Sequence, residues 1–360
     1  MKLAIVGPAF SGKTTVFNAL TGATEPLSDF SGGGQEHRRD VAVPDPRLDR
    51  LTQDYQAKKI SPARVEFLDM PAYGGDKYFG DVRQHEGLIR VVRAFKSDNV
   101  PHPKDRTDPR TSWRQDLADL DADFVIQDLA MIERRIEKLE KSSQKPTKTQ
   151  KEELEELALL RRIKPALEDG VPLKKSVAPE EQPKLAIFGF LTLKPLLTLV
   201  NLGDDDDPAD LGLPPPPADD ATFGPTDEVT IPIKARLEAE VAQLDEADRA
   251  SFLADFGLDE PIRGRILRLG YGLLGLQSFL TAGPKEVRAW TIRRGASAVE
   301  AAKAIHSDIA RGFIRAEVVS WADYVAHGGW KGARDAKRLR LEGKDYAMQD
   351  GDVVEFRHGG

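Results

Sequence analysis

The chain contains no cysteine, few aromatic residues and no long hydrophobic run. Without cysteine it can form neither a disulfide framework nor a thiolate metal site, which favours a reducing compartment. No apolar stretch approaches the roughly 20 residues that a membrane helix needs. The first apolar run begins at Leu3, which leaves no room for a secretory signal peptide. We therefore expect a cytoplasmic protein with no membrane partner.

Charged residues are abundant. Of the 360 residues, 31% are charged and 40% are hydrophobic, a composition typical of folded globular proteins with two or three domains at this length. The net charge of -7 argues against a wholly basic nucleic-acid binder. Residues 284–360 differ, because 14 Lys and Arg stand there against 11 Asp and Glu. This basic end favours a phosphate-rich partner, and an ordinary solvated surface explains it equally well.

The most informative segment follows residues 3–6, a short apolar run that predicts a buried strand. It fits the phosphate-loop pattern G-x-x-x-x-G-K-[ST], and a stretch that predicts a helix comes directly after it. Glycines let such a loop curl so that its N–H groups face phosphate oxygens, and the helix N-terminus adds its positive end. The lysine can reach the β- and γ-phosphates, and the threonine hydroxyl can bind Mg²⁺. We predict that a nucleotide contacts Gly7, Pro8, Ala9, Phe10, Ser11, Gly12, Lys13, Thr14 and Thr15, with Thr14 also a metal ligand.

Two further candidate sites follow predicted strands. Asp69 ends the alternating segment 64–68, and open α/β sheets hold their ligands at that end of a strand. We predict that Asp69 contacts Mg²⁺ through water. The strand predicted at 196–200 is followed by an asparagine and, three residues on, a carboxylate, where P-loop GTPases carry N-K-x-D and read the base. We predict base binding by Asn201, Leu202 and Asp204.

The remaining pattern gives the domain organisation. Apolar residues at helical spacing over 124–139 and 154–167, joined by a polar turn, predict an antiparallel helical hairpin. The hairpin is either a partner-binding arm or two helices packed on each other. We also predict a strand at 185–190 and, beyond residue 275, a small mixed sheet with one helix, a β-grasp pattern. The predicted fold is an α/β P-loop G domain (residues 1–120 and 185–278) with a helical-hairpin insertion (121–184) and a C-terminal β-grasp domain (279–360).

Longer matches extend along nearly the whole chain. They include PDPRLD at 44–49, VVRAF at 91–95, FLTLKP at 190–195 and FLTAGPKEVRAWT at 279–291. With these residues the chain resembles the YchF or Obg-like ATPase family of P-loop proteins. The resemblance implies a C-terminal TGS domain, binding and hydrolysis of ATP with Mg²⁺, and association with the ribosome or another RNA-containing particle. We expect no recognition of DNA sequence.

Several positions depart from the family pattern. Gly33 stands where the family has a metal-ligating threonine, and Ala72 where it has the glycine of D-x-x-G. Asp204 replaces a glutamate, which leaves the choice between ATP and GTP open. In one respect the chain is like the family: such families lack the hydrolytic glutamine after D-x-x-G, and Tyr73 here likewise cannot orient a water as an amide would. Two functions therefore remain open: a slowly hydrolysing ATPase switch, and a nucleotide-binding scaffold without turnover.

Overall fold

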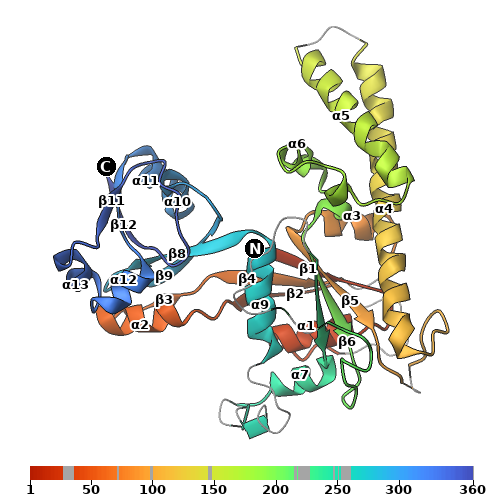
Figure 1. The fold of residues 1–360 in the computed structure, drawn as a ribbon, viewed down its shortest axis with the longest axis horizontal. Helices are drawn as coiled ribbons and strands as arrows, with labels where there is room; N and C mark the ends of the chain where they lie inside the picture. Colours follow the sequence, from red (N-terminus) through yellow and green to blue (C-terminus); the bar gives the residue numbers. More distant parts are fainter. Residues whose placement is uncertain are drawn as a thin grey trace. The chain divides into compact units, whose positions relative to one another are not determined.

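The computed structural model describes residues 1–26, 36–70, 73–97, 100–144, 148–214, 217, 228–245, 248–249, 251–252 and 261–359. The chain forms two compact units, residues 1–39 with 66–265 and residues 40–65 with 266–360. Figure 1 shows the elements of each unit. The α/β fold class predicted from the sequence is confirmed, with a mostly parallel sheet in the first unit and a mixed sheet in the second.

The first unit is built on a six-stranded sheet with the order β2-β4-β1-β5-β6-β7. β1 pairs in parallel with β4 and β5, and β6 pairs in parallel with β5 and β7. Every residue of β5 and β6 is buried, as expected for a parallel sheet that is covered on both faces. The strands are β1 (Lys2–Val6), β2 (His37–Ala42), β4 (Arg64–Asp69), β5 (Gly87–Arg93), β6 (Leu196–Asn201) and β7 (Glu228–Ile233).

Helices follow several of these strands along the chain. They include α1 (Lys13–Thr21), α3 (Asp76–Arg83), α7 (Ala235–Val241), α9 (Ile262–Leu273), which continues into the second unit, and the short η1 (Leu173–Lys175). In the described part of the chain, no helix is both long enough and apolar enough to cross a membrane.

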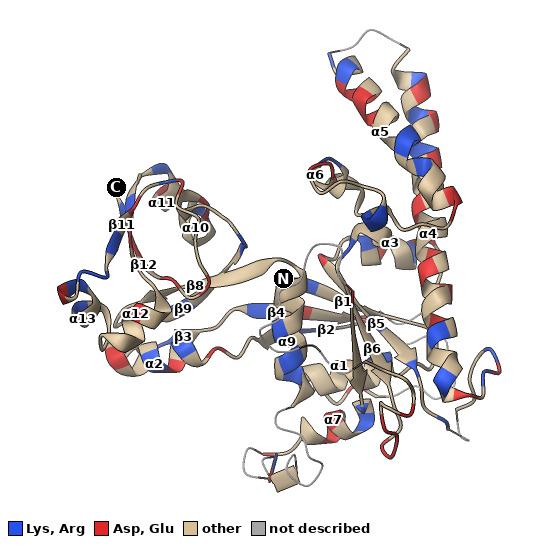
Figure 2. Cartoon of the chain, in the orientation of Figure 1, with Lys and Arg blue, Asp and Glu red and all other residues tan. Residues whose placement is uncertain are grey.

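The predicted helical hairpin consists of α4 (Pro109–Ser142) and α5 (Gln150–Glu168), which lie side by side (Figure 1). Their buried seam includes Ile132 and Leu139 of α4 and Leu160 of α5. α4 begins well before the predicted start of the insertion, because Asp108 caps the helix by accepting a hydrogen bond from the Arg110 N–H. Figure 2 shows positive and negative residues interleaved along both helices.

The strand predicted at 185–190 is wrong. The segment forms helical turns instead: α6 (Gln182–Leu185), η2 (Ala186–Phe188) and η3 (Leu191–Leu193). Gly189 turns the chain at φ +58°, and the buried Asp128 carboxylate accepts the N–H groups of Leu191 and Thr192. A six-residue apolar run does not by itself distinguish a strand from a buried turn, and the acidic partner comes from a distant helix.

The second unit is a mixed sheet with the order β11-β10-β12-β8-β9-β3. Helix α10 covers one face over Phe279 and Val318, as predicted for a β-grasp arrangement. The strands are β3 (Ile60–Ser61), β8 (Leu276–Ala282), β9 (Val287–Arg293), β10 (Phe313–Val319), β11 (Arg340–Glu342) and β12 (Val353–His358). The helices are α2 (Pro46–Tyr55), α10 (Ala298–Ile305), α11 (Ser307–Arg311), α12 (Trp321–Ala326) and α13 (Trp330–Asp335).

Residues 40–65 pack with the C-terminal residues, although the predicted nucleotide-binding domain included them. Leu48 and Leu51 of α2 belong to the same buried cluster as Leu280 and Ala289, and β3 pairs in parallel with β9. Arg47 reaches Asp350 at 2.7 Å. The predicted domain boundaries stay a prediction, and the compact units of the structure group residues 40–65 with residues 266–360.

The basic segment after α13 is not one continuous helix. A continuous helix over 333–341 would place Arg334, Lys337 and Arg338 on one face. α13 ends at Asp335, Lys337 has a φ of +59°, and the edge strand β11 begins at Arg340. Arg334 lies in α13, whereas Lys337 and Arg338 follow its end, so the three residues do not share one helix face. Arg334 and Arg338 have acidic neighbours at 3.6 and 3.7 Å.

Substitution of Leu51 tests which unit contains α2. Leu51 is 0% exposed, so Leu51→Ala should lower the free energy of opening of the second unit by about 2–5 kcal/mol. Amide hydrogen exchange should then become faster in β8 and β9 and stay unchanged in β5 and β6. The matched control is Ile187→Ala, because Ile187 is 88% exposed and such surface changes stay within about 0.5 kcal/mol. Faster exchange in β5 and β6 alone would contradict the grouping.

Candidate nucleotide-binding site

The phosphate loop lies between the end of β1 and the start of α1, and two of its glycines are required by close packing. A Cβ on Gly7 would lie 2.2 Å from the Val91 carbonyl oxygen. A Cβ on Gly12 would lie 2.3 Å from Nδ2 of Asn201, and Gly12 has a φ of +94°. No side chain fits at either position without moving the sheet or Asn201. The loop is therefore fixed by its neighbours before any ligand binds.

Lys13, the first residue of α1, turns its amine back onto the loop. Nζ donates hydrogen bonds to the carbonyl oxygens of Gly7 and Pro8 at 3.1 and 2.9 Å. The residue is only 8% exposed, and burial lowers the pKa of Lys13 to about 8 even though the Asp69 carboxylate opposes this shift. The amine is thus held at the loop by two carbonyls that a phosphate group can replace.

Thr14 and Asp69 form the second contact of the loop. The Thr14 hydroxyl donates to Oδ2 of Asp69 at 2.7 Å. Oδ1 of Asp69 and Oγ of Ser11 are buried and have no hydrogen-bond partner among the described residues. Burial raises the pKa of the Asp69 carboxyl, against the Thr14 hydrogen bond, which lowers it. A buried carboxylate oxygen without a partner requires a ligand, a water or an ion.

This arrangement fits Mg²⁺. The ion prefers oxygen ligands and is held by one or two protein groups together with substrate phosphates and water. Thr14 Oγ1 and the unused oxygen of Asp69 supply such oxygens next to the loop. No group of three or more His, Asp or Glu side chains that could hold a metal is found among the described residues, so phosphates and water would complete the shell.

Asn201, at the end of β6, joins the loop to α7. Its Nδ2 donates to the Ser11 carbonyl oxygen at 3.1 Å, and its Oδ1 accepts the Ala235 N–H at 3.2 Å. The side chain is 5% exposed, and both ends of its amide contact backbone. In this structure Asn201 therefore holds the phosphate loop in place, while its predicted contact with a base stays a prediction.

The other two predicted base contacts lie in different surroundings. The Leu202 side chain is buried in an apolar cluster with Val92 and Trp113. Asp204 is partly exposed, with its backbone oxygen accepting from Lys234 Nζ at 2.6 Å and its carboxylate 3.8 Å from Arg236. Both assignments stay predictions, and the carboxylate of Asp204 is the one that a ligand can reach. The switch positions Gly33 and Ala72 lie outside the described residues.

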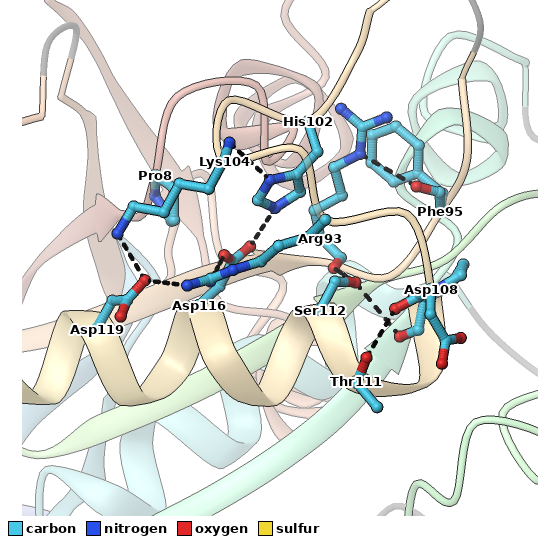
Figure 3. A network of polar contacts seen from close by, with 12 residues as sticks. Pro8, Arg93, Phe95, His102, Lys104, Asp108, Thr111, Ser112, Asp116 and Asp119 are labelled. Atoms are coloured by element: carbon cyan, nitrogen blue, oxygen red, sulfur yellow. Dashed lines mark hydrogen bonds and ion pairs between the residues drawn. The ribbon is translucent and has the colours of Figure 1, made fainter.

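A cavity of about 300 Å³ opens beside the loop. Lys13 lines it from the loop side, and Tyr73, His102, Asp116 and Asp123 line it from the other elements. Figure 3 shows the polar network on one wall, next to Pro8. Nδ1 of His102 accepts the Lys104 N–H at 3.1 Å, so the ring donates from Nε2 to Asp116, also at 3.1 Å. This fixes the tautomer and ties residues 102–104 to α4.

Comparison with known proteins gives the family. A family model named YchF-GTPase_C, described as a protein of unknown function (DUF933), matches residues 276–359. The chain is 36% identical to the ribosome-binding ATPase YchF of Haemophilus influenzae, over 99% of this chain and 98% of the relative. The chain belongs to the YchF family. The ribosome-binding ATPase YchF of Bacillus subtilis is 35% identical over 98% of both chains. The structure of the Schizosaccharomyces pombe YchF GTPase aligns with a TM-score of 0.81 at 26% identity, covering 99% of this chain and 97% of that chain.

Sequence reasoning missed part of the site of this YchF-family chain. From the sequence, Tyr73 is notable only for lacking an amide that could orient a water, and no motif marks Asp123, Asp116 or His102. The sequence signal of Asp116 and Asp123 is weak, because carboxylates on a long charged helix such as α4 usually face solvent. The spacing of Asp116 and Asp123, seven residues apart, does place both on one helix face. Only the structure shows that this face lies against the phosphate loop.

The buried amine of Lys13 predicts a pH dependence of triphosphate binding. The pKa of about 8 belongs to the free protein, and bound phosphates favour the protonated form. Binding must therefore take up a proton above pH 8, so affinity should be constant below about pH 7.5 and should fall towards tenfold per pH unit above pH 8.

The matched variant is Lys13→Ala. It should bind a nucleoside triphosphate at least tenfold more weakly at pH 7, because hydrogen bonds to charged groups contribute about 1.5–3 kcal/mol each, and it should lose the pH dependence. Titration calorimetry from pH 7 to 9.5 at fixed Mg²⁺ measures both. Equal affinity, or the same pH profile in the variant, would show that phosphates bind elsewhere.

Proposed function

We propose that this chain is a cytoplasmic, Mg²⁺-dependent ATPase that hydrolyses slowly and binds the ribosome. The observation that carries the proposal is the pre-formed phosphate loop. In it, the Lys13 amine donates hydrogen bonds to two carbonyl oxygens that phosphate oxygens can replace, and the Thr14 hydroxyl donates to Asp69. Its relatives of 35–37% identity over the full length are ribosome-binding ATPases. In the proposed complex the loop residues Gly7 to Thr15 hold the phosphates. Thr14 ligates Mg²⁺, and Asp69 contacts the ion through water.

ATP is the proposed nucleotide, with GTP as the alternative to be tested. Leu202 stands where the base-reading lysine of a GTPase would be, which favours ATP. Asp204 has a short carboxylate that can accept hydrogen bonds from guanine, which favours GTP. Since the two residues favour different nucleotides, direct titration with ATP and with GTP decides the preference.

A nucleotide-binding scaffold without turnover is the second candidate. The observation that favours it is the loss of two switch residues, with Gly33 in place of threonine and Ala72 in place of glycine. The intact phosphate loop and the orphaned oxygen of Asp69 favour hydrolysis. The two functions differ in one property, the release of phosphate from bound nucleotide.

The ribosome contact is proposed for the C-terminal unit, in which residues 279–360 would be a TGS domain. Three lysines are exposed there: Lys331 in α13, Lys337 in the turn after it, and Lys344 just after the edge strand β11. Figure 2 shows the positive residues of this region. Contacts from such lysines to RNA phosphates give affinity without sequence preference, in keeping with the absence of any expected DNA sequence recognition.

Single-turnover hydrolysis tests the ATPase proposal. We expect a rate below about 1 s⁻¹, the low end of typical enzyme rates, because neither switch segment supplies the usual hydroxyl or amide. Removing Mg²⁺ with EDTA should abolish the reaction while Lys13→Ala serves as the inactive control. Binding of ATP without any phosphate release would support the scaffold, and a rate far above 1 s⁻¹ would show that the switch residues have been misplaced.

Neutralising the three C-terminal lysines tests the ribosome surface. Lys331, Lys337 and Lys344 changed together to Ala should weaken ribosome co-sedimentation and flatten its dependence on salt, because each phosphate contact releases counterions. The charge-matched control changes Lys138, Lys141 and Lys151 of the hairpin, which are also exposed. Loss of binding in the hairpin variant alone would place the partner surface on α4 and α5.

A further inference from the structure

Tyr73 and Asp123 form a hydrogen-bonded pair on the wall of the cavity beside the phosphate loop. The Tyr73 hydroxyl donates to Oδ2 of Asp123 at 2.5 Å. Both residues line the same cavity as Lys13, Pro8 and Ala9. The pair therefore shares a cavity with the loop at which we propose that the phosphates of a nucleotide bind.

Both members of the pair are held by packing. The Tyr73 ring contacts the rings of Tyr78 and Phe79 edge-on, with centroids 5.3 and 5.9 Å apart. Asp123 lies on α4 next to Phe124, which is 1% exposed and contacts Phe79. These contacts fix the phenol and the carboxylate before any substrate is present, as a positioning device requires.

The pair presents two acceptors to a water molecule. Because the single phenol hydrogen is given to Oδ2 of Asp123, the Tyr73 oxygen is left with lone pairs to accept. Oδ1 of the same carboxylate is a second acceptor. Burial and the hydrogen bond to Asp123 raise the pKa of the Tyr73 phenol, so the phenol keeps its hydrogen at neutral pH. A water that donates to both acceptors points its own lone pair away from them.

We propose that Tyr73 and Asp123 together position the water that attacks the γ-phosphorus of a nucleotide bound at the phosphate loop. The inference rests on the proposed ATPase function. The water oxygen bonds to the γ-phosphorus, and the bond to the bridging oxygen breaks with its electron pair passing to ADP. As this bond forms, one of the two water protons leaves its acceptor and passes to a phosphate oxygen, which gives ADP and inorganic phosphate. Tyr73 alone cannot act as an amide does, but its partner on α4 supplies the second acceptor.

The test is single-turnover hydrolysis by Tyr73→Phe, Asp123→Asn and the double variant, with the affinity for a non-hydrolysable ATP analogue measured in parallel. Tyr73→Phe keeps the ring packing and removes the hydroxyl. Asp123→Asn replaces one acceptor by an NH₂ donor. Each should lower the rate at least tenfold and change the dissociation constant less than twofold. The double variant should be no more than about twofold slower than the slower single one, because the two groups act as a unit.

The matched control is Tyr324→Phe. Tyr324 also donates its hydroxyl to a carboxylate, that of Asp54 at 3.1 Å, but it lies in the second unit. Its rate should equal the wild-type rate. An unchanged hydrolysis rate in Tyr73→Phe, or a loss of nucleotide affinity that matches the loss of rate, would show that the pair is only a structural contact. Either result would overturn this inference and leave the proposed function intact. Absence of hydrolysis in the wild-type chain would overturn the proposed function and this inference with it.

Discussion

The hydrogen bonds of Asn201 are the contacts on which the proposed nucleotide site depends. They tie the Ser11 carbonyl and the Ala235 N–H to the end of β6 at 3.1 and 3.2 Å. The Asn201 side chain also requires glycine at position 12, because a Cβ there would lie 2.3 Å from Nδ2 of Asn201. Since the loop cannot move without breaking these contacts, its N–H groups are oriented before a ligand arrives. The conformational entropy of the loop is therefore lost when the chain folds and not when the ligand binds.

A second set of contacts joins the segment after Asp69 to the hairpin. Tyr73 at its start donates to Asp123, and Arg83 at the end of α3 contacts Asp128 at 2.6 Å. Asp128 is 0% exposed and also accepts the N–H groups before β6. A buried carboxylate of this kind is tolerated because every partner is a hydrogen-bond donor. Any displacement of residues 73–83 must carry α4 with it or break these contacts.

Sequence patterns predicted the elements whose information is local. The phosphate loop, the hairpin and the mixed C-terminal sheet each have their own spacing, and the structure contains all three. The features that sequence patterns did not predict involve long-range partners. Residues 185–190 form turns because the Asp128 carboxylate accepts hydrogen bonds from the N–H groups of the residues that follow them. Residues 40–65 pack on strands that lie more than two hundred residues away in the sequence. The pairing of Tyr73 with Asp123 is of the same kind, since no spacing connects a loop tyrosine to one acidic residue of a long helix.

The most direct test of the phosphate site is a crystal structure of the chain with Mg²⁺ and a non-hydrolysable ATP analogue. We expect Lys13 Nζ to leave the carbonyls of Gly7 and Pro8, now at 3.1 and 2.9 Å, and to lie on the β- and γ-phosphates. Thr14 should leave Asp69 and ligate the ion, while Asn201 keeps both of its backbone contacts. A nucleotide bound away from the loop, or a Lys13 amine still held by the two carbonyls, would contradict the account.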